Sequence, residues 1–132
     1  MSCLIKESMT ILYVQNQARS VAFYRALLQR DPVLNVEGMT EFDLDGNGRL
    51  GIMPAIDIAP ILQHKVKCPH QLSNAPRAEF YWVVDNPGEC YERLTQAGGA
   101  AISSLSLRPW GDEAAYGLDP DGYLLAFARH KA

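Results

Sequence analysis

Two segments of this chain repeat one pattern, and this repeat limits the possible folds more than any other feature. "MTILYVQNQARSVAFYRALLQ" begins at Met9 and "EFYWVVDNPGECYERLTQAGG" begins 70 residues later, at Glu79. Each segment starts with a strand-like run, passes through an asparagine and continues with apolar residues at helical spacing. Asn16 and Asn86 are natural N-caps, because their side-chain oxygens can accept from amides of the first helical turn. Each segment therefore predicts a strand followed by an amphipathic helix.

A second pair of matching stretches follows these helices, at an offset of 74 residues. "FDLDGNGRLGIM" begins at Phe42 and "YGLDPDGYLLAF" at Tyr116. Turn residues interrupt both: in the later stretch Pro120 presets φ and Gly122 can adopt a positive φ. Further β-branched and aromatic runs precede each hairpin. Each half of the chain is therefore predicted to be a βαβββ module.

The expected fold class is α+β, with two tandem βαβββ modules in one domain that spans residues 1–132. The modules should cover about 8–54 and 78–130. The intervening stretch, about 55–77, has no clear period and several prolines, so we expect an irregular connection with at most a helical turn. A length of 132 residues with 48% hydrophobic and 20% charged residues is consistent with one compact unit.

Charge and hydropathy exclude some partners. The formal net charge is -3 and no lysine or arginine cluster is present, so nucleic acid is not an expected partner. Apolar runs are short and Lys6 and Glu7 interrupt the first residues, so we expect no membrane segment and a cytoplasmic location. The three cysteines, Cys3, Cys68 and Cys90, form no CxxC pair and are expected to be free thiols.

The "YVQNQARSVAFY" opening, the "PWG" tripeptide and the late "LDPDG" turn, combined with the repeat, resemble the vicinal oxygen chelate superfamily. This superfamily includes glyoxalase I, bleomycin-resistance proteins and extradiol dioxygenases, and the resemblance runs from Met9 to Arg129. It implies that the eight strands form one cupped mixed sheet with the helices on its outer face. It also implies a small molecule held in the cup and two chains paired as a homodimer.

In metal-dependent members of this superfamily, the first and last strands of each module carry His and Glu ligands at four corners of the cup. Carried over by count, these corners fall on Met9, Ile52, Glu79 and Ala126. A catalytic site normally needs about three protein ligands of N, O or S type. Only Glu79 is a ligand for a hard or borderline cation, so we expect no metal and no cofactor.

The leading hypothesis is a protein that binds a small, partly aromatic or cationic molecule in an apolar cup without a metal. Seven residues are predicted to line the cup: Met9, Ile11, Ile52, Glu79, Tyr81, Trp110 and Ala126. Glu79 could pair with a cationic ligand or act as a base, or it could lie exposed at a strand start. Trp110 could stack on a flat ligand, or it could cap the sheet or fill a dimer contact.

Two other functions stay open. One is a lyase, isomerase or dioxygenase that uses an unrecognised metal site or Glu79 as acid and base. The other is an interaction module whose cup is filled by its own side chains. His64, Cys68 and His70 contain metal-binding atoms, but Pro69 interrupts any helix that would align them, and a solvated linker explains the stretch. His130 is expected to be a solvated tail residue.

Overall fold

The computed structural model describes residues 3–69 and 75–131, and these form an α+β fold of two βαβββ modules, as predicted. The first module consists of β1 (Ser8–Val14), α1 (Gln17–Leu28), β2 (Leu34–Val36), β3 (Met39–Asp43) and β4 (Gly48–Pro54). The second consists of β5 (Glu79–Val83), α3 (Pro87–Gln96), β6 (Ala100–Leu107), β7 (Asp112–Leu118) and β8 (Leu124–His130). Helix α2 (Ala55–Ile61) follows β4.

The strands pair within their own module, as two mixed sheets of four strands each. The orders are β1-β4-β3-β2 and β5-β8-β7-β6. In each sheet the first and last strands of the module run parallel, and the remaining neighbours are antiparallel. By internal contacts the chain divides into two compact units. One runs up to Val21 and resumes at Gln29, and the other joins residues 22–28 to the second module. Each sheet is therefore described by itself.

Both predicted N-caps are present. Asn16 Oδ1 accepts from the backbone N–H of Arg19 at 3.0 Å, and Asn86 Oδ1 accepts from that of Glu89 at 3.2 Å. Pro87 opens α3, where its missing N–H costs no helical hydrogen bond. The Glu89 carboxylate accepts a hydrogen bond from the side-chain amide of Asn86 at 3.4 Å. The asparagines therefore start both helices where the repeat indicated.

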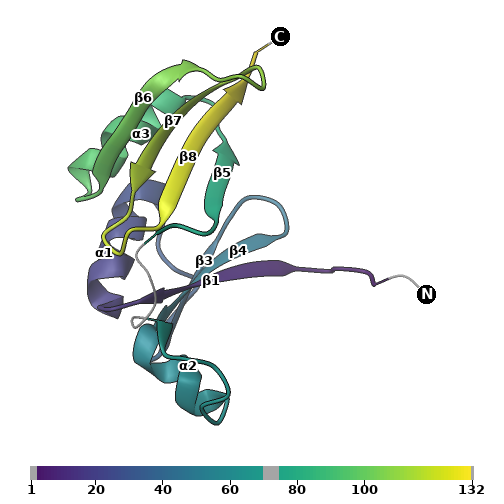
Figure 1. The fold of residues 1–132 in the computed structure, drawn as a ribbon, viewed down its shortest axis with the longest axis vertical. Coiled ribbons are helices and arrows are strands. Elements are labelled where there is room, and N and C mark those ends of the chain that lie inside the picture. The colour runs from purple at the N-terminus through teal and green to yellow at the C-terminus, as the bar shows by residue number, and fades with distance from the viewer. Residues whose placement is uncertain (1–2, 70–74, 132) are drawn as a thin grey trace. The chain divides into compact units, whose positions relative to one another are not determined.

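Helix α3 packs on one face of the second sheet through a leucine that sits over glycines. A Cβ added to Gly117 of β7 would lie 2.7 Å from Leu94 Cδ2, and one added to Gly99 would lie equally close. Leu94 is fully buried, as is Leu125, and Phe127 is 2% exposed. Figure 1 shows α3 on this side of β6, β7 and β8. This face of the sheet is the core of the second unit.

The connection after β4 contains more helix than predicted. Helix α2 is seven residues long, with Pro60 inside it and the buried Ala55 and Ala59 on its inner side. The backbone then turns through Gln63 and His64, both at positive φ. No helix within 3–69 or 75–131 has the length and apolar character that a membrane span requires.

The register corrects the offset between the two hairpins. Leu44 N–H donates to Gly48 O in the first turn, and Asp119 N–H donates to Tyr123 O in the second. The turns therefore superpose at 75 residues and not at the predicted 74. Aligning the glycines of the two turns gave the wrong count, because Gly48 closes the first hairpin whereas Gly122 lies inside the second. As a consequence, the first-module equivalent of Ala126 is Gly51.

A buried hydrogen bond joins α1 to the second hairpin inside one unit. Tyr24 Oη donates to Asp119 Oδ2 at 2.5 Å, and both residues are almost fully buried. The other carboxylate oxygen of Asp119 accepts from the backbone N–H groups of Asp121 and Tyr123, each at 2.9 Å. Burial raises the pKa of Asp119, and the Tyr24 hydrogen bond opposes that rise. The first Asp of the "DPDG" turn therefore fixes the turn to the helix.

Replacing Tyr24 with Phe should destabilise the fold, because the buried Asp119 carboxylate would lose a donor that no water can easily replace. Hydrogen bonds to charged groups contribute about 1.5–3 kcal/mol, so we expect a loss of that order in urea unfolding at pH 7. Tyr91→Phe is the matched control, since the described residues give its hydroxyl no hydrogen-bond partner. Equal stabilities of the two variants would contradict the role of this bond.

Candidate functional site

The side of the second sheet that faces away from α3 carries most of the predicted site residues. Tyr81 of β5 is paired with Ala126 of β8, and Ala126 is paired with Tyr116 of β7. Paired residues share a face, so these three side chains lie together with Glu79, two positions before Tyr81. We call this side the aromatic face. It brings Glu79, Tyr81 and Ala126 together, as the strand period predicted.

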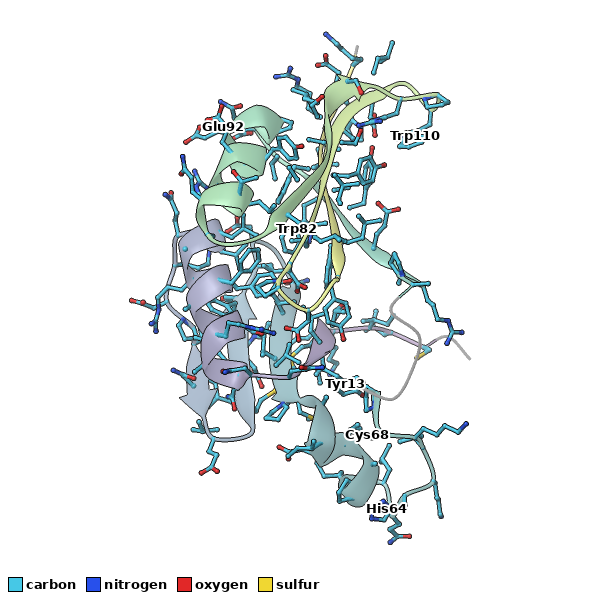
Figure 2. The ribbon with its side chains drawn as sticks, turned by 60° about the vertical axis from the view of Figure 1, so that its left-hand side comes forward. Tyr13, His64, Cys68, Trp82, Glu92 and Trp110 are labelled. Atoms are coloured by element: carbon cyan, nitrogen blue, oxygen red, sulfur yellow. The ribbon has the colours of Figure 1, made fainter. Side chains whose placement is uncertain are left out.

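Trp110 reaches the aromatic face from the loop between β6 and β7. Its indole Nε1 donates to Tyr81 Oη at 2.8 Å, and the two ring centroids are 6.3 Å apart at an angle of 60°. The Trp110 side chain is 57% exposed, so it is held in place while much of its ring remains accessible. Figure 2 shows Trp110 at the end of the sheet, on the side away from α3. Trp82 alternates to the other face and contacts Phe127.

The hydrogen bond from Trp110 continues into a chain of three more groups. Tyr81 Oη donates to Asp112 Oδ2 at 2.6 Å, and His130 Nδ1 lies 2.8 Å from Asp112 Oδ1. Because β8 separates β5 from β7, the Tyr81 side chain must cross β8 to reach Asp112. The small residue Ala128 leaves room there, and it is fully buried. The chain therefore fixes the orientation of the Tyr81 ring.

The pKa shifts in this chain follow from its hydrogen bonds. The bond from His130 and then the bond from Tyr81 lower the pKa of Asp112. Desolvation and the Asp112 bond together raise the pKa of Tyr81, while the Trp110 bond opposes that rise. At neutral pH, Asp112 is thus a carboxylate that accepts a hydrogen bond from Tyr81, and Tyr81 keeps its proton. The phenol is a fixed donor to Asp112 and a fixed acceptor from Trp110.

A second arrangement on the aromatic face combines a cation with an aromatic ring. The guanidinium carbon of Arg108 lies 5.0 Å from the ring centroid of Tyr116. Desolvation and the negative charge of Glu79 raise the pKa of Tyr116, and the charge of Arg108 lowers it. Tyr116 therefore lies within the electrostatic reach of one acid and one base. Glu79 is exposed, and the structure gives it no hydrogen bond or ion pair with any described residue.

Sequence reasoning missed four members of this face: Arg108, Asp112, Tyr116 and His130. His130 was expected in a solvated tail, but it is the last residue of β8 and contacts Asp112, although its side chain remains 72% exposed. The period of two along β8 places His130 on the face of Ala126, and that signal could have identified it. Asp112 and Tyr116 required the pairing of β7 with β8.

In the first unit, Met9 and Ile11 share a face, as predicted, but Ile52 does not. Met9 is paired with Arg49 and Ile11 with Gly51. A Cβ on Gly51 would lie 2.9 Å from Ile11 Cγ1 and 3.2 Å from Met9 Sδ, so both side chains extend over this glycine.

The placement of Ile52 with these residues was wrong. Ile52 is paired with Leu12 and Thr40 and is fully buried with them on the opposite face. The cause is the one-residue error in the hairpin offset, because a shift of one residue moves a side chain to the other face of a sheet.

The four corner positions, corrected for this offset, are Met9, Gly51, Glu79 and Ala126. Glycine has no side chain, so the correction adds no ligand, and one carboxylate remains the only hard donor of the set. A divalent cation with about three protein ligands does not fit these residues. Within the described ranges, no three His, Cys, Asp or Glu side chains are grouped so that they could hold a metal ion.

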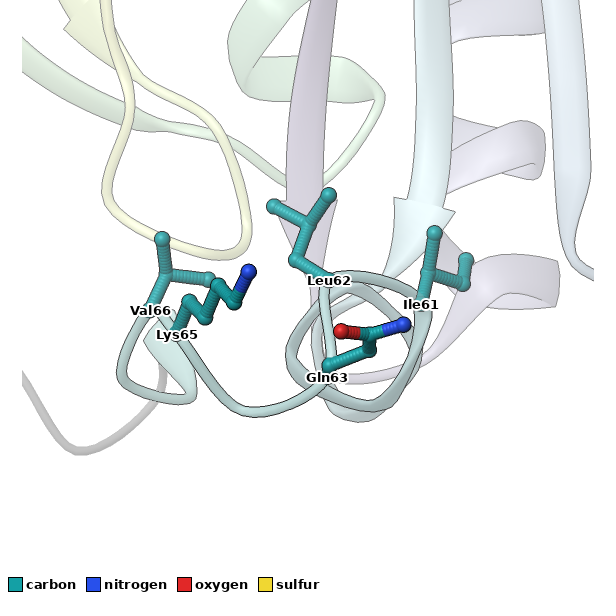
Figure 3. Close-up of a pocket in the computed structure, with 5 residues that line it drawn as sticks. All are labelled: Ile61, Leu62, Gln63, Lys65 and Val66. Carbon is teal, nitrogen blue, oxygen red and sulfur yellow. The ribbon is translucent and has the colours of Figure 1, made fainter.

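The His64 and Cys68 stretch forms no such group either. Cys68 Sγ lies 3.5 Å from the carbonyl oxygen of Ala55, and His70 lies outside the described residues. An open pocket of about 350 Å³ lies nearby, lined by Ile61, Leu62, Gln63, Lys65 and Val66 (Figure 3). It contains one charged side chain and none of the predicted site residues, so it is separate from the candidate site.

Comparison with known proteins places the chain in a family. The model of the Glyoxalase/Bleomycin resistance protein/Dioxygenase superfamily matches residues 8–127. The chain belongs to this superfamily, which confirms the resemblance seen in the repeat and the turn motifs. No curated protein matches the chain.

Solved structures share the fold at low sequence identity. A glyoxalase-related enzyme from Fulvimarina pelagi is similar with a TM-score of 0.81 and 19% identity, over 96% of this chain and 89% of that one. A glyoxalase/bleomycin resistance protein/dioxygenase family enzyme from Burkholderia phytofirmans PsJN has a TM-score of 0.76 and 14% identity, over 93% and 97%. Protein ATC0852 from Agrobacterium tumefaciens has a TM-score of 0.76 and 24% identity, over 98% and 100%. These similarities establish the fold alone.

The hydrogen bonds to Asp112 can be tested by titration. Replacing Tyr81 with Phe, or His130 with Ala, should raise the pKa of Asp112, because each change removes a bond that favours the carboxylate. Side-chain carboxyl NMR shifts followed from pH 7 to pH 2 measure this pKa directly. Tyr116→Phe is the control: it lies on the same face without bonding Asp112, and should leave the titration unchanged.

The sign of the accompanying stability change is fixed by linkage. A carboxyl whose pKa is lowered by folding stabilises the native state above its unfolded pKa, and this contribution disappears as the pH falls through the folded pKa. Both variants should therefore lose less stability than the parent on acidification across that window. If the pKa of Asp112 is unchanged in both variants, the hydrogen bonds from Tyr81 and His130 to Asp112 do not form in solution.

Proposed function

We propose that this protein binds a small, partly aromatic or cationic molecule on the aromatic face of its second module, without a metal. The observation that carries the proposal is the residue content of that face: Tyr81, Trp110 and Tyr116 gather there, while the corner positions supply one carboxylate. Aromatic rings offer stacking surfaces, and they also attract cations. Such a face suits recognition of a flat or positively charged molecule better than chelation.

Each residue has a distinct part in this proposal. Trp110 supplies an exposed ring, and the bond to Tyr81 restricts its rotation, so little side-chain entropy is lost when a ligand stacks on it. Glu79 supplies a negative charge that no described residue neutralises. Ala126, paired with both Tyr81 and Tyr116, is fully buried, so it separates these rings and is not itself proposed as a ligand contact. For the first sheet, taken by itself, Met9 and Ile11 are proposed as residues that can contact a ligand, and residues 1–132 are proposed as one domain.

A second candidate is an enzyme of the lyase, isomerase or dioxygenase type. The observation that favours it is Glu79, an exposed carboxylate with no hydrogen bond or ion pair to a described residue, next to the fixed phenol of Tyr81. Such a carboxylate could accept a proton from a bound substrate without a metal. Glu79→Gln separates the two functions, because it would abolish turnover in the enzyme yet leave stacking on Trp110 in place.

Binding can be measured with benzyltrimethylammonium and indole, which represent an aromatic cation and a flat neutral ring. We expect both to shift the indole N–H resonance of Trp110, and not that of Trp82, in the presence of a chelator. Loss of one indole signal in Trp110→Phe assigns the two resonances. Mass spectrometry of gently purified protein gives the metal content, and one tightly held Ni, Zn, Fe or Mn per chain would refute the metal-free proposal.

We also propose that the chain forms a homodimer, which the resemblance implied. Support comes from apolar side chains left in water on the described chain: Ile102 and Leu107 of the edge strand β6 are 55% and 66% exposed. Exposed apolar area of this kind is common where a second chain binds. Light scattering at micromolar concentration should give twice the chain mass of 14.6 kDa. A monomer mass would exclude the dimer.

A further inference from the structure

Arg108 lies on the aromatic face, with its guanidinium against the Tyr116 ring. Its Nε and Nη2 both donate to the carbonyl oxygen of Ala114, at 3.1 and 2.8 Å. Nη2 also reaches Ser103 Oγ at 2.9 Å and Ser104 O at 3.0 Å. These bonds clamp one edge of the guanidinium, and the Tyr116 ring lies against its plane. The group is therefore held in a single orientation.

The partners of Arg108 are all neutral oxygens. Other arginines of the described chain pair with carboxylates: Arg93 with Glu89 at 3.1 Å, and Arg129 with Glu113 at 2.8 Å. No carboxylate within 3–69 or 75–131 forms such a pair with Arg108. The positive charge is thus neutralised by no side chain, although the residue is half-buried. A clamped, half-buried and unpaired arginine attracts an external anion more strongly than a freely moving one.

The remaining nitrogen, Nη1, shows where that anion would bind. It has two N–H donors, and the structure gives neither an acceptor among the described residues. No buried side-chain nitrogen of the described residues lacks a partner, so Nη1 is open to solvent. An oxyanion can therefore reach it and form charge-assisted hydrogen bonds with it. Trp110 lies two residues further along the same loop and presents its ring on the same face.

From this geometry we infer that the ligand carries an oxyanion, a carboxylate or a phosphate, next to its aromatic ring. Arg108 Nη1 donates to the oxyanion, while the ring stacks on the Trp110 and Tyr81 side. This inference rests on the proposed function and narrows its ligand class. Glu79 lies on the same face, two positions before Tyr81 on β5. It then selects ligands that also carry a positive group, so that an aromatic zwitterion uses both charges.

Four probes of similar size test the charge requirement: benzoate, phenyl phosphate, benzylammonium and the neutral benzyl alcohol. Titrations followed by the Trp110 indole N–H resonance give each dissociation constant. We expect benzoate or phenyl phosphate to bind at least about tenfold more tightly than benzyl alcohol, which corresponds to about 1.4 kcal/mol. Whichever of the two anions binds more tightly identifies carboxylate or phosphate as the preferred group.

Variants separate the two levels of the proposal. Arg108→Gln should reduce the advantage of the anion to less than threefold and should not weaken benzylammonium binding, because the change removes a positive charge. Retained benzylammonium binding also shows that the loop is intact. Arg30→Gln makes the same change of net charge in the other unit. It should change neither the advantage of the anion nor the binding of benzylammonium. Arg108→Lys keeps the positive charge but loses the planar guanidinium. Its anion advantage should lie between that of the parent protein and that of Arg108→Gln.

Two results would overturn the inference. If benzyl alcohol binds as tightly as both anions in the parent protein, Arg108 recognises no oxyanion, although the proposed binding function stands. If Arg108→Gln preserves the anion advantage, the anion binds elsewhere. A failure of all four probes, together with benzyltrimethylammonium and indole, would instead refute the proposed function itself. If Arg108→Gln binds none of the probes, the comparison of benzoate with benzyl alcohol in the parent protein decides whether the face recognises an oxyanion.

Discussion

The parallel pairing of the first and last strands in each module is the constraint on which the site depends. In the second sheet, β5 lies beside β8 with Tyr81 opposite Ala126. This register decides which side chains face α3 and which form the aromatic face, because the side-chain period of a strand is two. Leu94 in turn requires the small Gly117 on the helix side. A shift of β8 by one residue would put Phe127 where Ala128 lies and close the path that Tyr81 takes to Asp112.

The sequence allowed the modules, both N-caps and four residues of the aromatic face to be predicted, because these depend mainly on local chemistry. Asn86 with Pro87 starts a helix whatever surrounds it, and alternation places Glu79 with Tyr81. Ile52 could not be placed in the same way. Its face depends on how many residues the preceding turn contains, and glycine can occupy different positions in turns of different geometry. The pairing of Leu44 with Gly48 supplies that information, and the sequence does not.

The polar chain of Trp110, Tyr81, Asp112 and His130 was invisible to sequence reasoning for a related reason. Its members come from a strand, a loop and the facing ends of two other strands, so only the sheet order brings them together. Their residue types also carry no motif. What joins them is the requirement that a partly desolvated phenol and carboxylate satisfy each other. The outcome is an exposed indole whose orientation is fixed by its hydrogen bond to Tyr81.

The ionisable groups of the aromatic face differ in whether their charge is paired. Some hold other side chains in position, and others can interact with a ligand. Asp112 is engaged by Tyr81 and His130, so its charge maintains the position of the rings. Arg108 is clamped by neutral oxygens and keeps its full charge, and Glu79 has no bonded partner among the described residues. Metal-dependent members of the superfamily carry metal ligands at the corner positions. The aromatic face of this protein instead carries one carboxylate, one fixed guanidinium and three aromatic rings. The selectivity of the face would then come from ring stacking and two opposite charges, since the corner residues cannot provide coordination.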